Sequence, residues 1–467
     1  MFDNLSSNEA MWNYNCLDDI FTREVGETLQ RSLKETGLES VDAFQHRLFP
    51  AVLHTMLRGV KIDLAARARM NKLLSDELSS REGYLAEVLG HPIKWPGAGG
   101  KLVSLYNSPK QMQVLFYDDF RLPTVWKKNE KGMRVPTLDD SALELLRRKE
   151  PLVWPIIKRI QECRSILKFR SNFVEADLEE GRMRCSYNMC GAETYRFSSS
   201  KNVWGGGCNM QTIPMGGEED DSDLELPNVR TMFVPDDDQT FFDIDLSKAD
   251  LRIVVKEADE KEMQAMLDEG RDPYIETARE FYRDPTITKV RPNGSPDPKY
   301  KMFKSFGHGT HYLGTPQGLA QRLGLTVHEA TRTQAWYLGK YSAIRKWQER
   351  FVEEIKRTHS VSNKFGYRRH YFGRIDDSTF REAIAWLPQS TVGCLINRIW
   401  LNLWDAKGPV EVLLQVHDSL AGQFPAARKD ESMDSLRLAG QVVIPYPSPL
   451  IIPIGIKTSE KSWGDCG

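Results

Sequence analysis

Two aspartates, far apart in the sequence, each stand at the end of an apolar, strand-like run. Asp245 follows such a run at residues 241–244, and Asp418 follows one at residues 412–416. Carboxylates held on rigid strands provide the oxygen ligands that suit Mg²⁺, which keeps its other positions for water and substrate phosphates. Two such ions, about 3.5–4 Å apart, can stabilise the attacking and the leaving oxygen of an in-line phosphoryl transfer. The pair therefore predicts a site for two-metal phosphoryl transfer.

The strand pattern alone leaves the choice of carboxylate open in the first strand. Side chains alternate along a strand, so Asp243 and Asp245 fall on the same face and spacing does not choose between them. A lone aspartate in such a place is more often a turn or cap residue. In the second segment, Ser419 and Gly422 follow Asp418 closely and favour a hairpin turn.

A basic and aromatic segment lies between the two carboxylates. Lys304, His308 and Tyr312 recur at a spacing that places them on one face of a helix. A lysine there can neutralise a triphosphate and donate a proton to departing pyrophosphate, and the rings can stack on bases. Gly307 and Gly309 each weaken a plain helix by about 1 kcal/mol relative to alanine, which favours close approach of a ligand or neighbouring backbone over an ordinary amphipathic helix. A strand that ends in an aspartate, then a basic helix, then a second strand that ends in an aspartate predict, in that order, a nucleotide polymerase.

Composition limits the class of protein without choosing its function. The chain of 467 residues is long enough for about three domains, and 40% hydrophobic with 27% charged residues is ordinary for a soluble globular protein. No apolar run is long enough for a membrane span, and no leader precedes an apolar segment, so we expect no membrane association and no secretion. Seven cysteines without metal-site spacing indicate reduced thiols and a cytoplasmic protein. A net charge of −2 does not exclude nucleic acid, because phosphate contacts depend on local basic patches.

The elements that would position these residues follow from periodicity. Residues 1–50 have apolar positions at helical spacing, and a long basic helix is expected from about 155 to 174. Strand signals dominate 183–258, helical periodicity returns between 259 and 358, and the tail after Pro409 alternates as strands do. The pattern favours an α+β platform with a helical domain inserted into it.

The motifs together resemble those of family A (Pol I-like) DNA polymerases of the phage or bacterial type, over almost the whole chain. Residues 245–252 resemble the first palm motif of that family, which selects Asp245 over Asp243, and residues 416–418 resemble its third. The fingers helix is matched by 304–312. Further matches are the primer-template segment at 194–200 and 208–214, the minor-groove region at 365–369 and 381–390, and the thumb at 106–111 and 164–168.

The resemblance implies a fold, substrates and a role for each matched residue. It implies a right-hand arrangement with a helical remnant of an exonuclease domain at 1–50, thumb and connecting helices at 51–185, palm at 186–258, fingers at 259–345 and the rest of the palm at 346–467. Primer-template DNA and deoxynucleoside triphosphates are the implied partners. The implied residues are Asp245 and Asp418 as ligands of two Mg²⁺ ions; Lys304 as general acid; Asp250, His308, Tyr312 and Lys301 for the nucleotide; and Arg196, Gln211, Arg252, Arg381, Gln389 and His417 for DNA.

Several positions depart from the family pattern. Asp250 stands where glutamate is usual at the position that blocks a 2′-hydroxyl, and His308 replaces an aromatic residue against the sugar. Tyr300 stands in place of an arginine that meets the triphosphate, a role that Lys299 or Lys301 would then take. Ser419 follows Asp418 where glutamate is usual, and His-Asp-Ser is what the related single-subunit RNA polymerases show. Asp250, His308 and Ser419 together suggest the alternative, a ribonucleotide-tolerant or primer-independent polymerase. A catalytically silent DNA-binding subunit of a replisome is a further alternative, although both carboxylates and the lysine are present.

The N-terminal segment carries a separate signal. Residues 14–18 resemble the last motif of the 3′→5′ exonuclease domain of the family, whose earlier Asp-x-Glu motif would lie upstream. The same letters at 177–179 and 223–225 come later, in charged loops, and are interpreted as chance. We therefore expect no proofreading by this chain. A separate exonuclease subunit that docks on residues 1–50, or a processivity factor, is the partner expected besides DNA.

Overall fold

The structure, a computed structural model, describes residues 7–96, 100, 102–129, 131–215, 224–292 and 294–466. Residues 1–6 of the expected N-terminal helical segment lie outside this range, as does Asp223 of the second Asp-x-Glu sequence. Within the described part of the chain, none of the helices combines the length and hydrophobicity needed to cross a bilayer.

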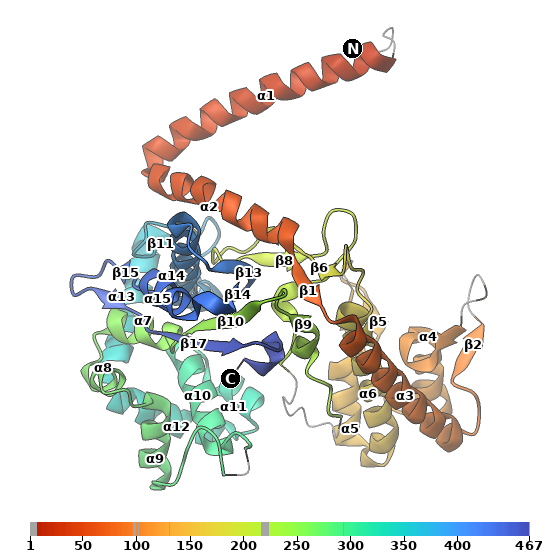
Figure 1. Cartoon of the computed structure of the whole chain (residues 1–467). Helices are drawn as coiled ribbons and strands as arrows, with labels where there is room; N and C mark the ends of the chain where they lie inside the picture. Colours follow the sequence, from red (N-terminus) through yellow and green to blue (C-terminus); the bar gives the residue numbers. More distant parts are fainter. Residues whose placement is uncertain are drawn as a thin grey trace.

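The centre of the molecule is a four-stranded antiparallel sheet. Its strands, β10 (Gln239–Leu246), β13 (Glu411–Val416), β14 (Ser419–Pro425) and β17 (Ile454–Ser459), are arranged in the order β13-β14-β10-β17 (Figure 1). Apolar residues alternate with polar ones in β10, and Phe241 and Phe242 are fully buried in the larger hydrophobic core. The register pairs Asp245 of β10 with Ser419 of β14. Asp418, the residue before Ser419, therefore ends next to the tip of β10.

A bundle of helices lies below this sheet in Figure 1 and has its own hydrophobic core. It consists of α7 (Ala249–Ala258), α8 (Lys261–Asp268), α9 (Pro273–Tyr282), α10 (Pro298–His311), α11 (Pro316–Leu323), α12 (Val327–Lys340) and α13 (Ser342–Thr358). Helix caps explain several of its boundaries. Asp272, Asp297 and Thr315 each precede a proline, and their side chains accept hydrogen bonds from the first backbone N–H groups of α9, α10 and α11.

A second helical region lies on the other side of the sheet (Figure 1). Its helices are α3 (Leu64–Leu89), α4 (Pro109–Gln113), α5 (Asp140–Lys149) and α6 (Trp154–Phe169). Short antiparallel ladders accompany them: β2 (Lys94–Pro96) with β3 (Leu102–Ser104), β4 (Trp126–Lys128) with β5 (Arg134–Pro136), and β7 (Ser186–Asn188) with β8 (Ser198–Ser200). Glu162 of α6 is buried and is paired with Arg81 of α3 and Arg159. This pairing ties the two longest helices of the region together.

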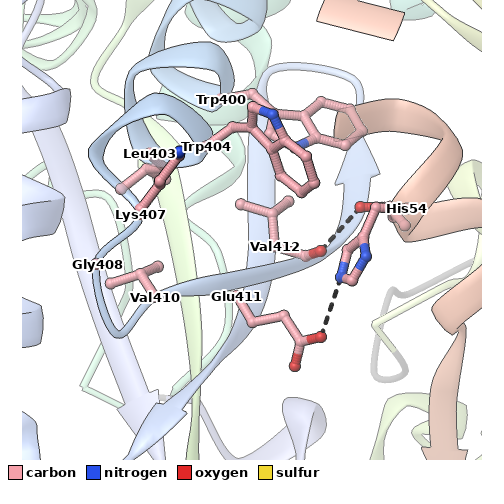
Figure 2. Close-up of a pocket in the computed structure, with 10 residues that line it drawn as sticks. His54, Trp400, Leu403, Trp404, Lys407, Gly408, Val410, Glu411 and Val412 are labelled. Carbon is pink, nitrogen blue, oxygen red and sulfur yellow. Dashed lines mark hydrogen bonds and ion pairs between the residues drawn. The ribbon is translucent and has the colours of Figure 1, made fainter. Parts of the chain in front are cut away.

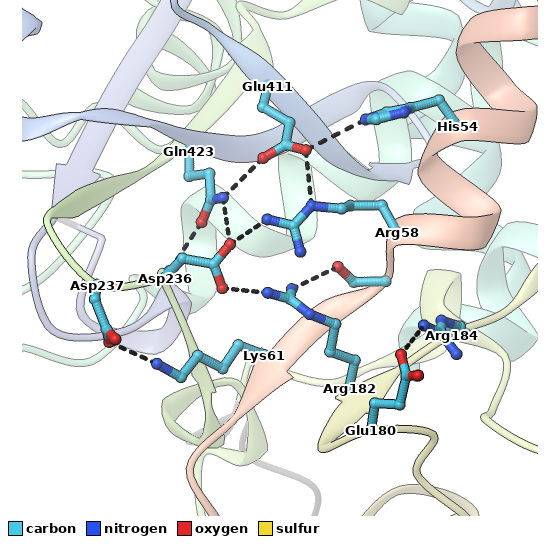
Figure 3. A network of polar contacts seen from close by, with 11 residues as sticks. His54, Arg58, Lys61, Glu180, Arg182, Arg184, Asp236, Asp237, Glu411 and Gln423 are labelled. Atoms are coloured by element: carbon cyan, nitrogen blue, oxygen red, sulfur yellow. Dashed lines mark hydrogen bonds and ion pairs between the residues drawn. The ribbon is translucent and has the colours of Figure 1, made fainter.

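An ionic network joins the second region to the central sheet (Figure 3). The three-stranded sheet β6 (Arg182–Met183), β1 (Val60–Ile62) and β9 (Phe233–Val234) lies at this junction. Asp236 is paired with Arg58 and Arg182, and Arg58 Nε donates to Glu411 Oε1 at 2.9 Å. Gln423 Nε2 donates to Asp236 and Glu411, at 2.8 Å each. Every carboxylate in this network has a partner, as partly buried charges require.

Long helices complete the fold. Helix α14 (Asp377–Ala406) packs against the sheet and against α2 (Glu39–Arg58), and α15 (Lys429–Ala439) follows β14. The ladders β11 (Ser360–Ser362) with β12 (Arg368–His370) and β15 (Val443–Ile444) with β16 (Leu450–Ile451) complete the strands. Helix α1 (Ser7–Thr36) projects away from the rest of the molecule (Figure 1), and seven of its large apolar side chains are more than half exposed.

The expected elements are found with two corrections. The helices expected near the N-terminus, from about 155 to 174 and between 259 and 358, are present as α1, α2, α6 and the bundle. Residues 183–258, where strand signals dominate in the sequence, end in the helix α7 instead, because its apolar residues pack into the core of the bundle. The tail after Pro409 is not made of strands alone, since α15 interrupts it with buried Leu436 on its inner face.

Candidate active site

The two aspartates predicted as metal ligands lie together at the mouth of one cleft. Asp245 ends β10, Asp418 lies in the tight turn that joins β13 to β14, and the ladder places them on adjacent strands. Both line a cleft of about 450 Å³, together with Asp250, Lys304 and His308. Three segments that are separated by up to 173 residues in sequence, from 245 to 418, therefore converge in one place.

The electrostatics of the cleft separate Asp245 from Asp243. Asp245 has its side chain open to the cleft, but the surrounding protein still desolvates its carboxylate. This desolvation, together with the charges of Asp418 and Asp243, raises the pKa of Asp245 to about 6. Asp243 lies further back in the sheet, where its carboxylate accepts a hydrogen bond of 2.7 Å from Trp463 Nε1. The open choice between the two carboxylates thus has a physical answer, since Asp243 has a structural partner and Asp245 faces the cleft.

These carboxylates fit a hard divalent cation. Two carboxylates lie at neighbouring positions, and burial together with like charge raises the pKa of one of them. A bound cation would neutralise this charge. Among the described residues, no group of three or more histidine, cysteine and acidic side chains forms a complete metal cage. Mg²⁺ is usually held by one or two carboxylates plus substrate phosphates and water, so two neighbouring carboxylates are a suitable set of protein ligands for it.

The turn that carries Asp418 is supported from below by buried amides. His417 adopts a left-handed backbone conformation (φ 55°) at the tip of the hairpin and is exposed. Gln415 Nε2 donates to the carbonyl of His417 at 2.6 Å, and Gln211 Nε2 donates in turn to Gln415 Oε1 at 2.6 Å. Gln211 is buried and its Nε2 is engaged by this contact; the DNA contact expected from sequence stays a prediction. Its place in the structure is a support for the turn.

Helix α10 presents Lys304 and His308 to the cleft. Its glycines allow close packing: a Cβ at Gly307 would lie 2.7 Å from the ring of Tyr274 in α9, and one at Gly309 would lie 2.7 Å from Leu319 in α11. The groups that approach these two glycines are therefore side chains, rather than the ligand or neighbouring backbone expected from the sequence. Lys301, predicted to meet the nucleotide, lies on the same helix but is not among the described residues that line the cleft.

A polar cluster lies beneath His308. Arg196 Nη2 lies 3.8 Å from Asp250 Oδ1, and the rings of His308 and Tyr312 are edge to face, with centroids 4.7 Å apart. Burial raises the pKa of Asp250, opposed by the charges of Arg196 and His308. Burial lowers the pKa of His308, opposed by the charge of Asp250. Asp250 Oδ1, Arg196 Nε and the Tyr312 hydroxyl are buried without a hydrogen-bond partner among the described residues. Unsatisfied polar atoms of this kind are expected where a ligand or water completes the site.

The remaining predicted DNA contacts lie outside the cleft lining. Arg252 Nε donates to the carbonyl of Ser247 at 3.1 Å, and burial lowers the pKa of its guanidinium. Arg381 lies in the first turns of α14, in a shallow groove with Arg374, and Gln389 lies two turns further along the helix and is partly buried. Their contacts with DNA stay predictions.

Residues not singled out as site residues also line the cleft. Lys289 reaches it from the loop between α9 and α10, and Lys248 Nζ lies 3.5 Å from Asp272 at its edge. Lys289 belongs to a basic run in the sequence, but no periodicity or motif marks it, because its position depends on how a loop folds back. Asp272 also lines the cleft, and its place directly before Pro273 indicates a helix cap. The structure confirms that it caps α9.

A second cavity of about 400 Å³ lies at the opposite end of β13 (Figure 2). Trp400 and Trp404 of α14 and His54 of α2 line it, and Glu411 at the start of β13 closes one side. His54 Nε2 lies 3.2 Å from Glu411 Oε1. None of the residues predicted for chemistry lines this cavity.

Comparison with known proteins agrees with the motifs. The sequence profile of DNA polymerase family A matches residues 98–463. The thermostable DNA polymerase I of Thermus filiformis is 24% identical over 94% of this chain and 50% of that protein; DNA polymerase I of Bacillus subtilis is 25% identical over 87% and 44%. The chain thus spans about half the length of these curated relatives.

The fold is shared with a solved polymerase domain. The structure described as the POL domain of Pol1 from M. smegmatis in complex with DNA primer-template and dNTP superposes with a TM-score of 0.77, at 20% identity, over 95% of this chain and 74% of that one. The predicted α+β right-hand fold is confirmed. The match of the family profile to most of the chain confirms the resemblance seen in its motifs. The chain belongs to DNA polymerase family A.

Proposed function

We propose that this protein is a template-directed DNA polymerase that extends a primer 3′-hydroxyl with deoxynucleotides by two-metal phosphoryl transfer. The observation that carries the proposal is the convergence of Asp245, Asp418 and Lys304 on one cleft. Two carboxylates opposite a lysine suit a substrate whose reacting centre is a phosphate and whose leaving group is a polyphosphate. Membership of the family and the solved relative with primer-template and dNTP support the same substrates.

In the proposed reaction the 3′-hydroxyl oxygen bonds to the α-phosphorus while the bond from that phosphorus to the β-bridging oxygen breaks. Two Mg²⁺ ions, when bound, would supply the positive charge that stabilises the attacking and leaving oxygens. Asp245 and Asp418 would hold them. Lys304 Nζ would hold the triphosphate and donate a proton to the leaving pyrophosphate, and the hydroxyl proton passes to water.

The direct test is primer extension by Asp418→Ala. Loss of one of two metal-binding carboxylates should abolish extension while duplex binding, measured by fluorescence anisotropy, stays nearly unchanged. The Asp243→Asn variant is the matched comparison, since this carboxylate faces Trp463 and not the cleft; it should keep extension if the protein folds. Synthesis by Asp418→Ala would refute the assignment. A wild-type protein that binds DNA without extending it would favour the catalytically silent alternative.

Sugar selection is the point on which the alternative polymerase rests. We propose that Asp250, with His308 above it, faces the 2′ position of the incoming nucleotide and that Tyr312 lies beside the templating base. The short side chain of Asp250 lies near Arg196 and leaves more room than glutamate would, which favours looser exclusion of ribonucleotides. Extension rates with dNTPs and rNTPs on one primed template decide this. Strong discrimination, on the order of 10⁴-fold or more, would rule out ribonucleotide tolerance.

DNA contacts outside the cleft are proposed for residues that the sequence pointed to. Arg196, Arg381, Gln389 and His417 would contact the primer-template, the first and third at minor-groove acceptors that all correct pairs share. For Gln211 the buried contact with Gln415 supports a positioning role instead. Such a polymerase would meet its template in the cytoplasm of a bacterial or phage-infected cell.

We also propose that this chain does not proofread. Glu179, in the first of the late Asp-x-Glu sequences, is held by Arg184 and Asn202 and is not free for a metal. Incubation with a mismatched primer and no nucleotides should leave the primer intact, and shortening of the primer would contradict the proposal. The exposed apolar side chains of α1, among them Tyr14, Phe21 and Val25, support docking of a separate exonuclease or processivity subunit there. Copurification from the native source that yields no such subunit would count against it.

A further inference from the structure

The loop between α9 and α10 brings a lysine into the cleft from outside the helix that carries Lys304. Its base is fixed at both ends. Ile287 is buried, and its carbonyl accepts a hydrogen bond of 2.9 Å from Arg279 Nε. The carbonyl of Lys289 accepts one of 3.3 Å from the backbone N–H of Asp297, the N-cap of α10. Lys289 is therefore attached to the start of the helix whose later turns carry the catalytic candidates.

The side chain of Lys289 lines the same cleft as Lys304 and Asp245. Within the described part of the chain, no carboxylate forms an ion pair with Lys289. An exposed cation that lines the cleft and has no carboxylate partner among the described residues is available to a phosphate.

The other basic residues near the start of α10 are less suited to this task. Lys299 Nζ lies 2.6 Å from Asp284 Oδ2 and over the ring of Tyr282. Lys301 is exposed on the helix and does not belong to the described cleft lining. Tyr300 lines the cleft but is uncharged, since burial and Asp272 raise its pKa to about 12.

We infer that Lys289 is the second triphosphate-binding cation of this protein, acting with Lys304 from a separate element. The inference rests on the proposed function and refines it. Lysine binds phosphate as a point charge on a flexible stem, so a loop residue can serve as well as a helix residue. Because Lys289 lies on the loop side of the cleft, it would hold the β- and γ-phosphates in the bound nucleotide and contribute to binding rather than to bond breaking. Its loss should raise KM more than it lowers kcat.

The test compares Lys289→Met with Arg291→Met, which removes the same charge from the same exposed loop but from a residue outside the described cleft lining. Lys289→Met should raise the KM for dNTP about 10-fold or more, as loss of a hydrogen bond to a charged group predicts, with kcat changed less than about threefold. Arg291→Met should leave KM within about twofold, and Lys289→Arg should restore most of the loss. An unchanged KM in Lys289→Met, or a larger rise in Lys301→Met, would overturn the inference.

Binding of inorganic tripolyphosphate to the protein, followed by calorimetry, tests the inference without catalysis. Lys289→Met should bind tripolyphosphate about 10-fold more weakly than wild type, and Arg291→Met should not. Equal binding by wild type and Lys289→Met would refute the role of Lys289. If wild type fails to extend a primer, the proposed function fails, and the tripolyphosphate measurement still decides whether Lys289 binds polyphosphate.

Discussion

Replacing Asp245 by asparagine should stabilise the metal-free protein while removing the activity proposed for it. The pKa of Asp245 is raised to about 6 by burial and by Asp418, from a usual value near 3.8. At pH 8 the carboxylate is ionised in both the folded and the unfolded protein, and the folded protein carries the penalty of desolvating it and holding it beside like charge. Asparagine keeps the shape and removes the charge.

The magnitude follows from the size of the pKa change. Two pKa units correspond to about 3 kcal/mol as an upper limit. Asp245 is open to the cleft, so solvent screens much of this and about 1 kcal/mol is the better expectation. For a chain of this length the free-energy change corresponds to a rise in Tm of about 1–2 °C.

The pH dependence gives the sign check. A carboxyl whose folded pKa is raised destabilises the folded state as the pH rises from its unfolded pKa to its folded pKa, and the penalty is complete above about pH 6. The Tm of Asp245→Asn should therefore exceed that of wild type at pH 8, and the difference should shrink at pH 5. Glu460→Gln, at an exposed carboxylate outside the cleft, is the control. Differential scanning fluorimetry without metal measures all three proteins.

Mg²⁺ should reverse the order of stability. Millimolar Mg²⁺ should raise the Tm of wild type, because a ligand that binds only the folded protein stabilises it, and should raise that of Asp245→Asn less. A lower Tm for Asp245→Asn at pH 8 without metal, or a difference that does not depend on pH, would refute the account of the cleft as a site of unrelieved carboxylate repulsion.

Two further predictions concern the scaffold. Gly207→Ala should destabilise the protein by about 2 kcal/mol or more in urea unfolding. The reason is that a Cβ at Gly207 would lie 1.8 Å from the carbonyl oxygen of Arg184, and φ is +73°. Gly205→Ala is the control, because Gly205 has a similar φ but no neighbour within 4 Å, and it should cost only about 1 kcal/mol. Equal losses would show that backbone conformation alone matters. Glu162→Ala should lower the free energy of unfolding by about 3 kcal/mol, because it leaves Arg81 without its buried partner; a loss under 1 kcal/mol in the same assay would show that solvent replaces the carboxylate.

Local pattern was sufficient to predict the parts of the site that lie on regular elements. Alternation and a tight turn place Asp245 and Asp418 at strand ends, and a spacing of four residues places Lys304 and His308 on one helix face, as the structure has them. That the two strands are neighbours required either the structure or the resemblance, because pairing across 173 residues, from 245 to 418, leaves no trace in local periodicity.

The parts that could not be predicted depend on contacts between distant segments. Gln211 looks like an exposed polar residue, and only the approach of Gln415, 204 residues later, turns it into a buried support. Lys289 lies in a loop, where composition predicts irregular structure but not direction. Lys301 has the expected charge but is not among the described residues that line the cleft, and its contact with the nucleotide stays a prediction. The proposed domain boundaries stay predictions.

The glycines of α10 have a consequence for movement. Without side chains at Gly307 and Gly309, α10 lies so close to α9 and α11 that the three helices leave one another no room to slide. We therefore expect the three helices to move together when the cleft widens or narrows, pivoting where they connect to α8 and α12. Lys304 and His308 would then approach or leave the carboxylates together. Binding of the triphosphate and proton donation to the leaving pyrophosphate would depend on the same motion.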